Sequence, residues 1–485
     1  MTVDYDVVII GGTPTGRYAA LMATQLQAKV ALVEPKPCYD FIPHYVFNEI
    51  GQLAPQLHCD HQYEIKALPF QTQQKYQIPF PWLQEAMLYA QSVAFHLEQL
   101  YSPAILSAQG IDVILGQGQF QSSPYLAFVV GDRLLRGRRY LLASGSIPAI
   151  PEIEGLQKTG FLTISNIWQS LNERTPPNNW VVLGGVPQSV EIAQTLARLG
   201  YSVTLIVNSP LIIRHADPEV AQLLQAQLEA EGVRVLTKTP VTQVRLLENK
   251  KWLQAGDKAI ETDEIVVAIA QQPNIEFLNL AAVGVKWRHR HLVVNERLQT
   301  TNRRIYACGD VIGGYDCAHI ANYEARIALK NALFFPRHKV NYRFIPWGIN
   351  SAPMFAQVGL TEAQAKQQYH PDGILVLRQY FQTLVAAHLQ EEITGMCKLI
   401  VRQNGEILGA SILGAQAREL INVITLAMTK KIKIHQVANL SAIFPSFSEI
   451  LEQTAAEWKK QKLQSNIFQQ ECLQGFFYCR RRWNL

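Results

Sequence analysis

TVDYDVVIIGGTPTG, residues 2–16, opens the chain with an apolar run from Tyr5 to Ile10 that leads directly into Gly11-Gly12-Thr13-Pro14-Thr15-Gly16. The run predicts a buried parallel strand, and a helix is expected from about Arg17. A strand, a tight turn and a helix place backbone N–H groups at the positive end of a helix dipole, where the pyrophosphate of a dinucleotide can bind. Gly11 makes the turn, and Gly16 lets helix and strand pack closely.

The next stretch of the chain strengthens this interpretation. A second strand is expected from Lys29 to Val33, and Glu34 follows at the distance expected for a carboxylate that accepts ribose hydroxyls. Thr13 replaces the middle glycine of the dinucleotide fingerprint. A glycine-rich loop in another doubly wound fold is the alternative, but the strand context and Glu34 together favour a dinucleotide.

A second element lies far downstream, where Arg304-Ile305-Tyr306-Ala307-Cys308-Gly309-Asp310-Val311 predicts a short strand that ends near an aspartate. A helix is expected from about Ala318. Here the chain resembles the pyridine nucleotide-disulfide oxidoreductases with two dinucleotide-binding domains, such as dihydrolipoamide dehydrogenase, glutathione reductase and mercuric reductase. The resemblance implies that Asp310 hydrogen-bonds the ribityl chain of FAD.

Further blocks extend the resemblance over nearly the whole chain. Ala143-Ser144-Gly145-Ser146-Ile147-Pro148 resembles the family's link between its two nucleotide domains, Ile213 to Glu219 resembles the segment after the nicotinamide strand, and Pro353 to Glu362 resembles the start of the interface domain. The fold implied is α/β, with two Rossmann-like dinucleotide-binding domains (FAD and NAD(P) type) and a C-terminal α+β dimerisation domain. A homodimer is implied as well.

The expected domain boundaries follow from these blocks. With 485 residues that are 48% hydrophobic, the chain is long enough for three domains with full cores. We expect an FAD-binding domain at 1–155 and 295–340, an NAD(P)-type domain at 156–294 and a dimerisation domain at 345–460. Residues 461–485 form a basic, aromatic tail.

Composition points to a reducing compartment. Seven cysteines form no C-x-x-C, and their odd number argues against a secreted disulfide framework. The N-terminus lacks the features of a signal peptide, and no apolar run reaches the roughly 18 residues needed to span a bilayer. The net charge of +5 is small for this length and gives no reason to expect nucleic-acid binding. We therefore expect a cytoplasmic protein.

The first departure from the family concerns its redox cysteines, a Cys-x4-Cys followed by Ile-Pro-Ser-Lys. The most similar segment here is Phe41-Ile42-Pro43-His44-Tyr45, which puts Phe41 and Lys36 at the two cysteine positions and Tyr45 at the lysine. Cys38 lies nearby, and Cys59 is the next thiol along the chain. We predict that the redox disulfide is absent. His44 is a candidate catalytic residue near the isoalloxazine, or else a packed polar side chain.

The second departure concerns the family's His-Pro-Thr-x-x-Glu, which supplies an acid/base from the partner subunit. The corresponding residues here are Phe444-Pro445-Ser446-Phe447-Ser448-Glu449. Phenylalanine cannot transfer a proton, although Glu449 remains as a second catalytic candidate. Both departures predict that the chain is not a disulfide reductase.

The nicotinamide motif is also altered. A strand at Trp180 to Leu183 leads into Gly184-Gly185-Val186-Pro187-Gln188-Ser189, in which only Gly184 keeps the place of a fingerprint glycine. Asn208 stands where an NAD enzyme presents a carboxylate to the ribose. Arg214 could meet a 2′-phosphate or hold a structural position. We expect weak NADPH or NADH binding through Gly184, Gly185, Asn208 and Arg214.

Two polar segments remain. His58-Cys59-Asp60-His61 has no common zinc spacing, so we interpret it as a polar loop and predict no metal site. In the tail, Phe476-Phe477-Tyr478-Cys479-Arg480-Arg481-Arg482-Trp483 places aromatic rings beside three arginines, a combination that can sit at an anionic lipid surface. A tail packed across the dimer, or without fixed structure, is the alternative.

Two functions from different classes follow. The first is an FAD-dependent oxidoreductase without a redox disulfide, which passes electrons from NAD(P)H or another reduced donor to a quinone or a protein. The alternative is a degenerate flavoprotein that keeps FAD as a structural or sensing element and acts by binding a partner or a membrane. A soluble transhydrogenase would require good nicotinamide binding. The expected FAD-binding residues are Gly11, Gly12, Thr13, Pro14, Thr15, Gly16, Glu34, Ala143, Ser144, Gly145, Gly309 and Asp310.

Overall fold

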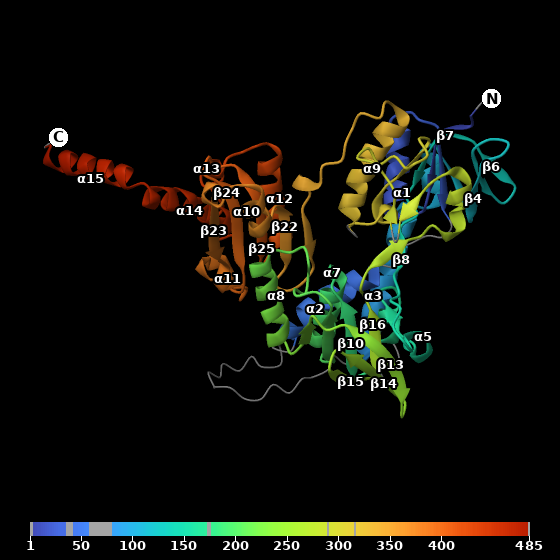
Figure 1. Cartoon of the computed structure of the whole chain (residues 1–485), viewed down its shortest axis with the longest axis horizontal. Coiled ribbons are helices and arrows are strands. Elements are labelled where there is room, and N and C mark those ends of the chain that lie inside the picture. Colours follow the sequence, from blue (N-terminus) through green and yellow to red (C-terminus); the bar gives the residue numbers. More distant parts are fainter. Residues whose placement is uncertain are drawn as a thin grey trace. The chain divides into compact units, whose positions relative to one another are not determined.

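The chain folds into two units, and each unit is built from two separate stretches of the chain. A computed structural model describes residues 3–34, 42–57, 80–171, 176–288, 291–314 and 317–483. Unit 1 comprises Met1–Asn208 and Thr239–Asn341, and unit 2 comprises Ser209–Lys238 and Tyr342–Leu485 (Figure 1). The domain boundaries expected from the sequence stay a prediction.

The first sheet of unit 1 is parallel, with strand order β20-β7-β1-β2-β3. Its strands are β1 (Tyr5–Ile10), β2 (Val30–Glu34), β3 (Ile111–Leu115), β7 (Gly137–Leu142) and β20 (Ile305–Ala307). Near-continuous apolar runs suit strands that are buried on both faces. One face packs against α1 (Pro14–Gln25) and α9 (Ala318–Leu333), and the other packs against the antiparallel strands β4 (Gly118–Gln121) and β5 (Ala127–Val130).

The second parallel sheet of unit 1 contains β11 (Ser202–Val207), β10 (Asn179–Gly184), β16 (Glu264–Val267) and β9 (Leu162–Thr163), in that order. Helix α7 (Pro187–Arg198) follows β10 and packs on it and on β11. Unit 1 therefore holds two strand-turn-helix units of the Rossmann type, as the sequence predicts.

Helix α2 (Ile42–Leu57) packs on α7 of the second nucleotide motif. The two helices approach closely at Gly51, where a Cβ would lie 3.0 Å from Cγ2 of Thr195. Its other neighbour is α3 (Phe80–Leu100), against which Ile42 and Val46 are buried. Small and apolar residues thus fix the position of α2 beside the second nucleotide motif.

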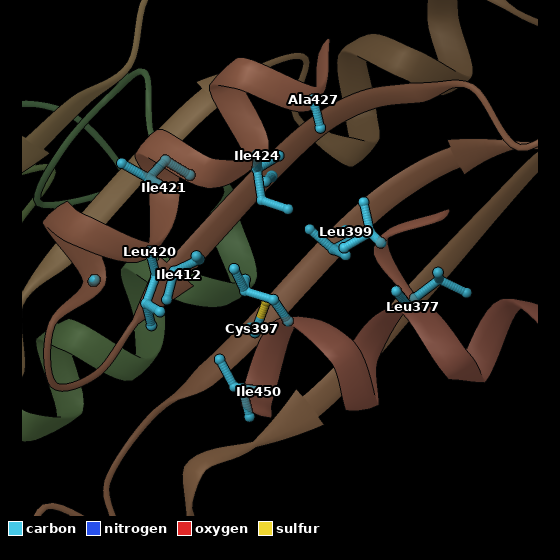
Figure 2. Close-up of a cluster of buried hydrophobic side chains, with 14 of the residues drawn as sticks. Leu377, Cys397, Leu399, Ile412, Leu420, Ile421, Ile424, Ala427 and Ile450 are labelled. Atoms are coloured by element: carbon cyan, nitrogen blue, oxygen red, sulfur yellow. The ribbon is translucent and has the colours of Figure 1, made fainter. Parts of the chain in front are cut away.

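Unit 2 contains an antiparallel sheet with strand order β21-β22-β25-β24-β23. Its strands are β21 (Trp347–Ile349), β22 (Phe355–Gly359), β23 (Ile374–Tyr380), β24 (Met396–Arg402) and β25 (Ile407–Leu413). Helices α12 (Ala417–Thr429) and α14 (Glu449–Ser465) bury apolar side chains against it, including Ile424 and Ile450 (Figure 2). This is the α+β domain that the sequence predicts.

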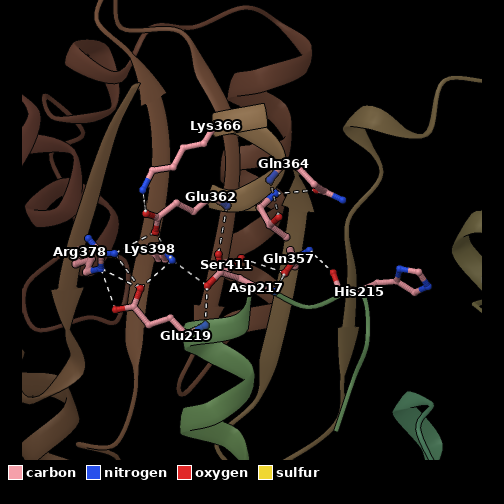
Figure 3. A network of polar contacts seen from close by, with 11 residues as sticks. His215, Asp217, Glu219, Gln357, Glu362, Gln364, Lys366, Arg378, Lys398 and Ser411 are labelled. Carbon is pink, nitrogen blue, oxygen red and sulfur yellow. Dashed lines mark hydrogen bonds and ion pairs between the residues drawn. The ribbon is translucent and has the colours of Figure 1, made fainter. Parts of the chain in front are cut away.

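Strand β24 also contributes to a buried polar network. Successive side chains of a strand point to opposite faces, so Cys397 and Leu399 join the apolar core while Lys398 points the other way. The ammonium of Lys398, only 2% exposed, lies 2.9 Å from Asp217, 2.8 Å from Glu219 and 2.8 Å from Glu362 (Figure 3). Asp217 and Glu219 begin α8 (Pro218–Ala230), so the network fastens this helix to the sheet.

The C-terminal part of unit 2 forms two consecutive helices. After α14, Asn466 interrupts the helix and its side chain accepts a hydrogen bond from the amide of Gln469 at 3.0 Å. Helix α15 (Ile467–Arg482) then extends away from the sheet of unit 2, as its red ribbon in Figure 1 shows. No helix among the described residues combines the length and the apolar character required to cross a bilayer.

Element boundaries near the first glycine motif differ slightly from the expectation. Strand β1 has its predicted bounds, but α1 begins at Pro14 and not near Arg17, and β2 ends at Glu34. Thr13 accounts for the earlier start, because its Oγ1 accepts a hydrogen bond from the amide of Gly16 at 3.1 Å and caps the helix. Proline favours the first helical position, since its fixed φ already suits the helix.

Candidate functional site

The expected FAD-binding residues meet at the carboxyl edge of the first parallel sheet. In the strand register Ile10 pairs with Val33 and Leu142, and Leu142 pairs with Ala307. The residues that follow each strand therefore emerge side by side: the turn from Gly11 to Gly16, Glu34, the link from Ala143 to Gly145, and Gly309 with Asp310. Ligands of doubly wound folds bind at this edge.

The glycine turn has space only for glycine at two positions. A Cβ on Gly11, whose φ is +129°, would lie 2.2 Å from the carbonyl oxygen of Ala143, and one on Gly16 would lie 1.9 Å from that of Gly11. Among the described residues, none accepts a hydrogen bond from the backbone N–H of Gly12 or Thr13. These two donors lie at the N-terminus of α1, where the helix dipole favours an anion. The turn therefore fits the pyrophosphate of a dinucleotide.

Thr13 fits this turn even though it replaces a glycine. Its hydroxyl donates to the carbonyl oxygen of Ala143 at 2.8 Å and accepts from the amide of Gly16. Its methyl group faces Gly145, where a Cβ would lie 3.1 Å away and where φ is +70°. Thr13 thus joins the turn to the link segment and takes up one helix N-terminal amide.

Glu34 has a partner that sequence reasoning missed. Its carboxylate accepts a hydrogen bond from Nε of Arg17 at 2.7 Å and a second one from Nη2 of Arg17 at 3.3 Å. Both side chains are buried. Glu34 also lies against Gly12, where a Cβ would be 2.9 Å from the glutamate side chain. The only sequence signal was an arginine directly after the motif, on a helix that is otherwise buried through small residues.

The Gly309–Asp310 segment is held by a second unforeseen acid. Buried Glu324 of α9 accepts a hydrogen bond from the amide of Gly309 at 2.7 Å. Beside it, burial raises the pKa of the Cys308 thiol well above its usual value, and the nearby Glu324 and Asp310 carboxylates raise it further. Cys308 therefore stays a protonated thiol under ordinary conditions and is a poor nucleophile.

His44, a candidate catalytic residue, forms a buried pair with a glutamate of the second nucleotide motif. Its Nε2 lies 2.6 Å from Oε2 of Glu191, with side chains only 6% and 8% exposed. His44 extends from α2 and Glu191 from α7, and none of the described residues hydrogen-bonds the buried Nδ1 of His44. At this distance the imidazole and the carboxylate form a hydrogen bond.

Aromatic rings enclose the histidine. The ring of His44 lies 5.7 Å from that of Trp168, which in turn stacks on Phe47 at 4.8 Å. One turn further along, Thr195 donates a hydrogen bond to Asn48 at 2.8 Å, again between α7 and α2. The polar pair thus sits among apolar surroundings, where hydrogen bonds and charges act strongly.

Two backbone amides of the second glycine turn donate hydrogen bonds to a side chain of the same turn. Oγ of Ser189 accepts hydrogen bonds from the amides of Gly185 at 3.0 Å and Val186 at 3.3 Å, and it donates to the carbonyl of Val186 at 2.6 Å. Asn208 is exposed and follows β11, at the same edge as Gly184, because Gly184 pairs with Val207. Arg214 is exposed and belongs to unit 2.

Glu449, the other catalytic candidate, has a local structural contact in unit 2. Its carboxylate accepts a hydrogen bond from the amide of Ser446 at 2.8 Å, just before α14. Phe444, the residue that we expect at the position of the family's histidine, is 69% exposed. The segment Lys36 to Phe41, with Cys38, and the segment His58 to His61, with Cys59, lie outside the described residues.

Two family profiles cover most of the chain. The profile described as "Pyridine nucleotide-disulphide oxidoreductase" matches residues 5–325, and its dimerisation domain matches residues 345–455. A mercuric reductase from Staphylococcus aureus is 29% identical over 477 residues, covering 94% of this chain and 83% of the relative. A dihydrolipoyl dehydrogenase from Synechocystis sp. is 28% identical over 484 residues, covering 93% and 98%.

Solved structures share the fold. A Cu(II) complex of the HOCl-induced flavoprotein disulfide reductase RclA from Escherichia coli has a TM-score of 0.79 at 23% identity, covering 94% of this chain and 100% of that one. LpdA from Mycobacterium tuberculosis has a TM-score of 0.80 at 22% identity, covering 93% and 99%. Members of the family use FAD and NAD(P)H. The chain, an α/β flavoprotein reductase fold with a C-terminal dimerisation domain, belongs to the pyridine nucleotide-disulphide oxidoreductase family.

Proposed function

We propose that the chain is an FAD-dependent oxidoreductase that passes electrons from a reduced donor through FAD directly to a non-disulfide acceptor, such as a quinone or a protein. The observation that carries this proposal is the buried His44–Glu191 pair, 2.6 Å apart. His44 belongs to the segment that resembles the family's redox segment, and it offers a proton carrier where that segment would offer thiol chemistry.

The residues at the edge of the first sheet would hold FAD. The amides of Gly12 and Thr13, which donate to none of the described residues, would bind the pyrophosphate, and Glu34, held by Arg17, would accept ribose hydroxyls with its remaining lone pairs. Asp310 would bind the ribityl chain. FAD, when bound, takes up electrons as a hydride and releases them singly or in pairs, so a dithiol is not chemically required.

The described cysteines of unit 1 do not offer an obvious replacement for the dithiol. Burial holds the thiol of Cys308 in its protonated form, and Cys317 is partly exposed and directly precedes α9. Cys38 and Cys59 are the remaining thiols of the N-terminal part of the chain. An experiment on electron uptake therefore has to include these two cysteines.

Reductive titration of the purified protein with dithionite, without oxygen, tests the proposal. FAD alone takes up about two electrons, whereas FAD with a redox disulfide takes up about four, since a disulfide is a two-electron couple. We expect about two in the wild type and in the Cys38→Ser/Cys59→Ser variant. Uptake of about four that falls to two in this variant would show a disulfide reductase and overturn the proposal.

The role of His44 has its own measurement. In His44→Gln we expect unchanged FAD content and a loss of acceptor turnover of about 10²-fold or more, the usual contribution of a positioned proton carrier. Thr195→Val is the matched control, because it removes a neighbouring hydrogen bond between α7 and α2 and leaves the His44–Glu191 pair intact. Equal turnover in both variants would give His44 a packing role only.

One observation favours a second candidate function. Ser189 already satisfies two amides of the second glycine turn, which leaves fewer donors for NAD(P)H. A flavoprotein that keeps FAD as a structural or sensing element would not need those donors. Adding NADH and then NADPH to the oxidised protein separates the two functions. Bleaching of the flavin by either nucleotide, or by another donor that supports turnover, favours the enzyme.

A further inference from the structure

Helix α15 carries an unusual concentration of exposed aromatic side chains. None of its described residues is buried, and its rings are 49% to 75% exposed. These rings, with the tryptophan that follows the helix, are Phe468, Phe476, Phe477, Tyr478 and Trp483. Exposed apolar surface of this extent on one element marks an interaction site.

The spacing of these residues orders them on the helix. Phe468, Cys472, Phe476, Cys479 and Trp483 follow one another at intervals of three or four residues, so they share one face. Leu473 and Phe477 extend the apolar surface further around the helix, as far as the side opposite Phe468. Most of the remaining positions are polar, among them Gln470, Glu471 and Gln474. One side of the helix is therefore rich in aromatic residues, whereas the opposite side carries polar residues together with Tyr478.

The charge of the chain is concentrated around this helix. Between residues 459 and 483 there are six basic side chains and a single acidic one, Glu471. The excess of five positive charges equals the formal net charge of the whole chain, +5, so the remainder of the protein is balanced. The basic residues form two groups, Lys459 to Lys462 before the aromatic segment and Arg480 to Arg482 at its end.

We propose that α15 docks flat on an anionic lipid surface, with the face of Phe468, Phe476 and Trp483 at the level of the headgroups. Aromatic and basic residues on a helix with a polar opposite face are the features of interfacial helices. Arginines flank the apolar face, where their long stems let the guanidinium groups reach lipid phosphates. This inference does not depend on the proposed redox function.

A second copy of the chain and a nucleic acid fit these observations less well. Two copies of α15 joined in parallel through the aromatic face would bring their arginines together, and like charges at such positions disfavour pairing. A nucleic acid would be met by basic residues along the whole element. Here the two basic groups are separated by an aromatic segment that is almost free of charge.

Flotation of the full-length protein with vesicles tests the proposal. We expect binding to phosphatidylcholine vesicles that contain phosphatidylglycerol, no binding to pure phosphatidylcholine, and release in 1 M salt, where the Debye length is about 3 Å. Changing Arg480, Arg481 and Arg482 together to Gln should weaken binding on the order of 100-fold, since each basic residue near an anionic surface contributes about fivefold.

Matched variants separate the site from general stickiness. Phe468→Ser with Phe476→Ser should also abolish binding, whereas Phe334→Ser with Phe335→Ser, at exposed rings of unit 1, should leave it unchanged. Because α15 buries no described residue, its variants should keep the wild-type melting temperature. Equal binding to both vesicle types, no binding to either, or binding to RNA alone would overturn the proposal. A halved mass of the α15 variants in light scattering would assign the helix to a second copy instead and also overturn it.

Discussion

Lys398 and Asp217 form a buried ion pair, 2.9 Å between Nζ and Oδ1, although 181 positions separate them in the chain. Their side chains are 2% and 0% exposed, and Glu219 and Glu362 complete the shell around the ammonium. Removing one member of a buried pair leaves the other charges uncompensated.

For Lys398→Met we therefore expect the free energy of unfolding, measured with urea, to fall by about 3–5 kcal/mol. Lys366→Met is the control, because Lys366 also bonds Glu362 but lies at the surface, where an ion pair contributes about 0–1 kcal/mol. Similar losses in the two variants would mean that Lys398 contributes no more than a surface charge.

Stability at low pH should report the carboxylate of Glu362. Burial alone would raise its pKa, but hydrogen bonds from Lys366 and Lys398 and their positive charges outweigh burial and lower the pKa from 4.5 to about 2. A depressed pKa in the folded state contributes stability above the unfolded value and loses it as pH falls through the folded value. The difference in unfolding free energy between wild type and Glu362→Gln should be constant above pH 4.5 and shrink steadily toward pH 2. A difference that grows on acidification would contradict this assignment.

The turn that we propose binds FAD should not tolerate a methyl group at Gly16. A Cβ there would lie 1.9 Å from the carbonyl oxygen of Gly11, so Gly16→Ala has to displace the turn that carries the amides of Gly12 and Thr13. We expect the ratio of flavin absorbance to protein to fall at least about tenfold. Gly475→Ala, whose Cβ meets only open space on α15, should keep full flavin content. Full content in both variants would place the pyrophosphate elsewhere.

Ser189→Ala should bind NAD(P)H more tightly than the wild type. The change removes the hydroxyl that accepts from the amides of Gly185 and Val186, so that both become available to a ligand. Calorimetry should show a severalfold lower Kd, at a cost of about 1 kcal/mol in stability for the lost cap. Ser202→Ala, at an exposed position on β11, serves as the control. An unchanged Kd would show that the nucleotide does not contact this turn.

Sequence reasoning predicted those features that depend on local chemistry or on ordered motifs. The strand at Tyr5–Ile10, the turn at Gly11, the loop at Gly309 and the three types of domain all have local signatures, and the fold class is confirmed. The start of α1 was placed three residues late because the capping hydroxyl of Thr13 was interpreted only as a missing glycine.

The partners of the site residues were not predictable in the same way. Arg17 with Glu34, Glu324 with Gly309 and His44 with Glu191 are paired by tertiary packing and not by spacing in the chain. His44 and Glu191 are 147 positions apart in the chain, and only the packing of α2 on α7 brings them into contact. The redox segment around Cys38 stays a prediction.

The polar network of unit 2 bears on how the protein is made. Asp217 and Glu219 are synthesised 181 and 179 residues before Lys398. Their carboxylates therefore cannot form these ion pairs until the ribosome has added Lys398. A fragment that begins at Tyr342 would contain Lys398 and Glu362 but would lack α8, and its buried ammonium would keep one of three carboxylates. Unit 2 therefore contains the match to the dimerisation-domain profile, residues 345–455, together with an earlier stretch of the chain that carries α8, and neither stretch should fold stably without the other.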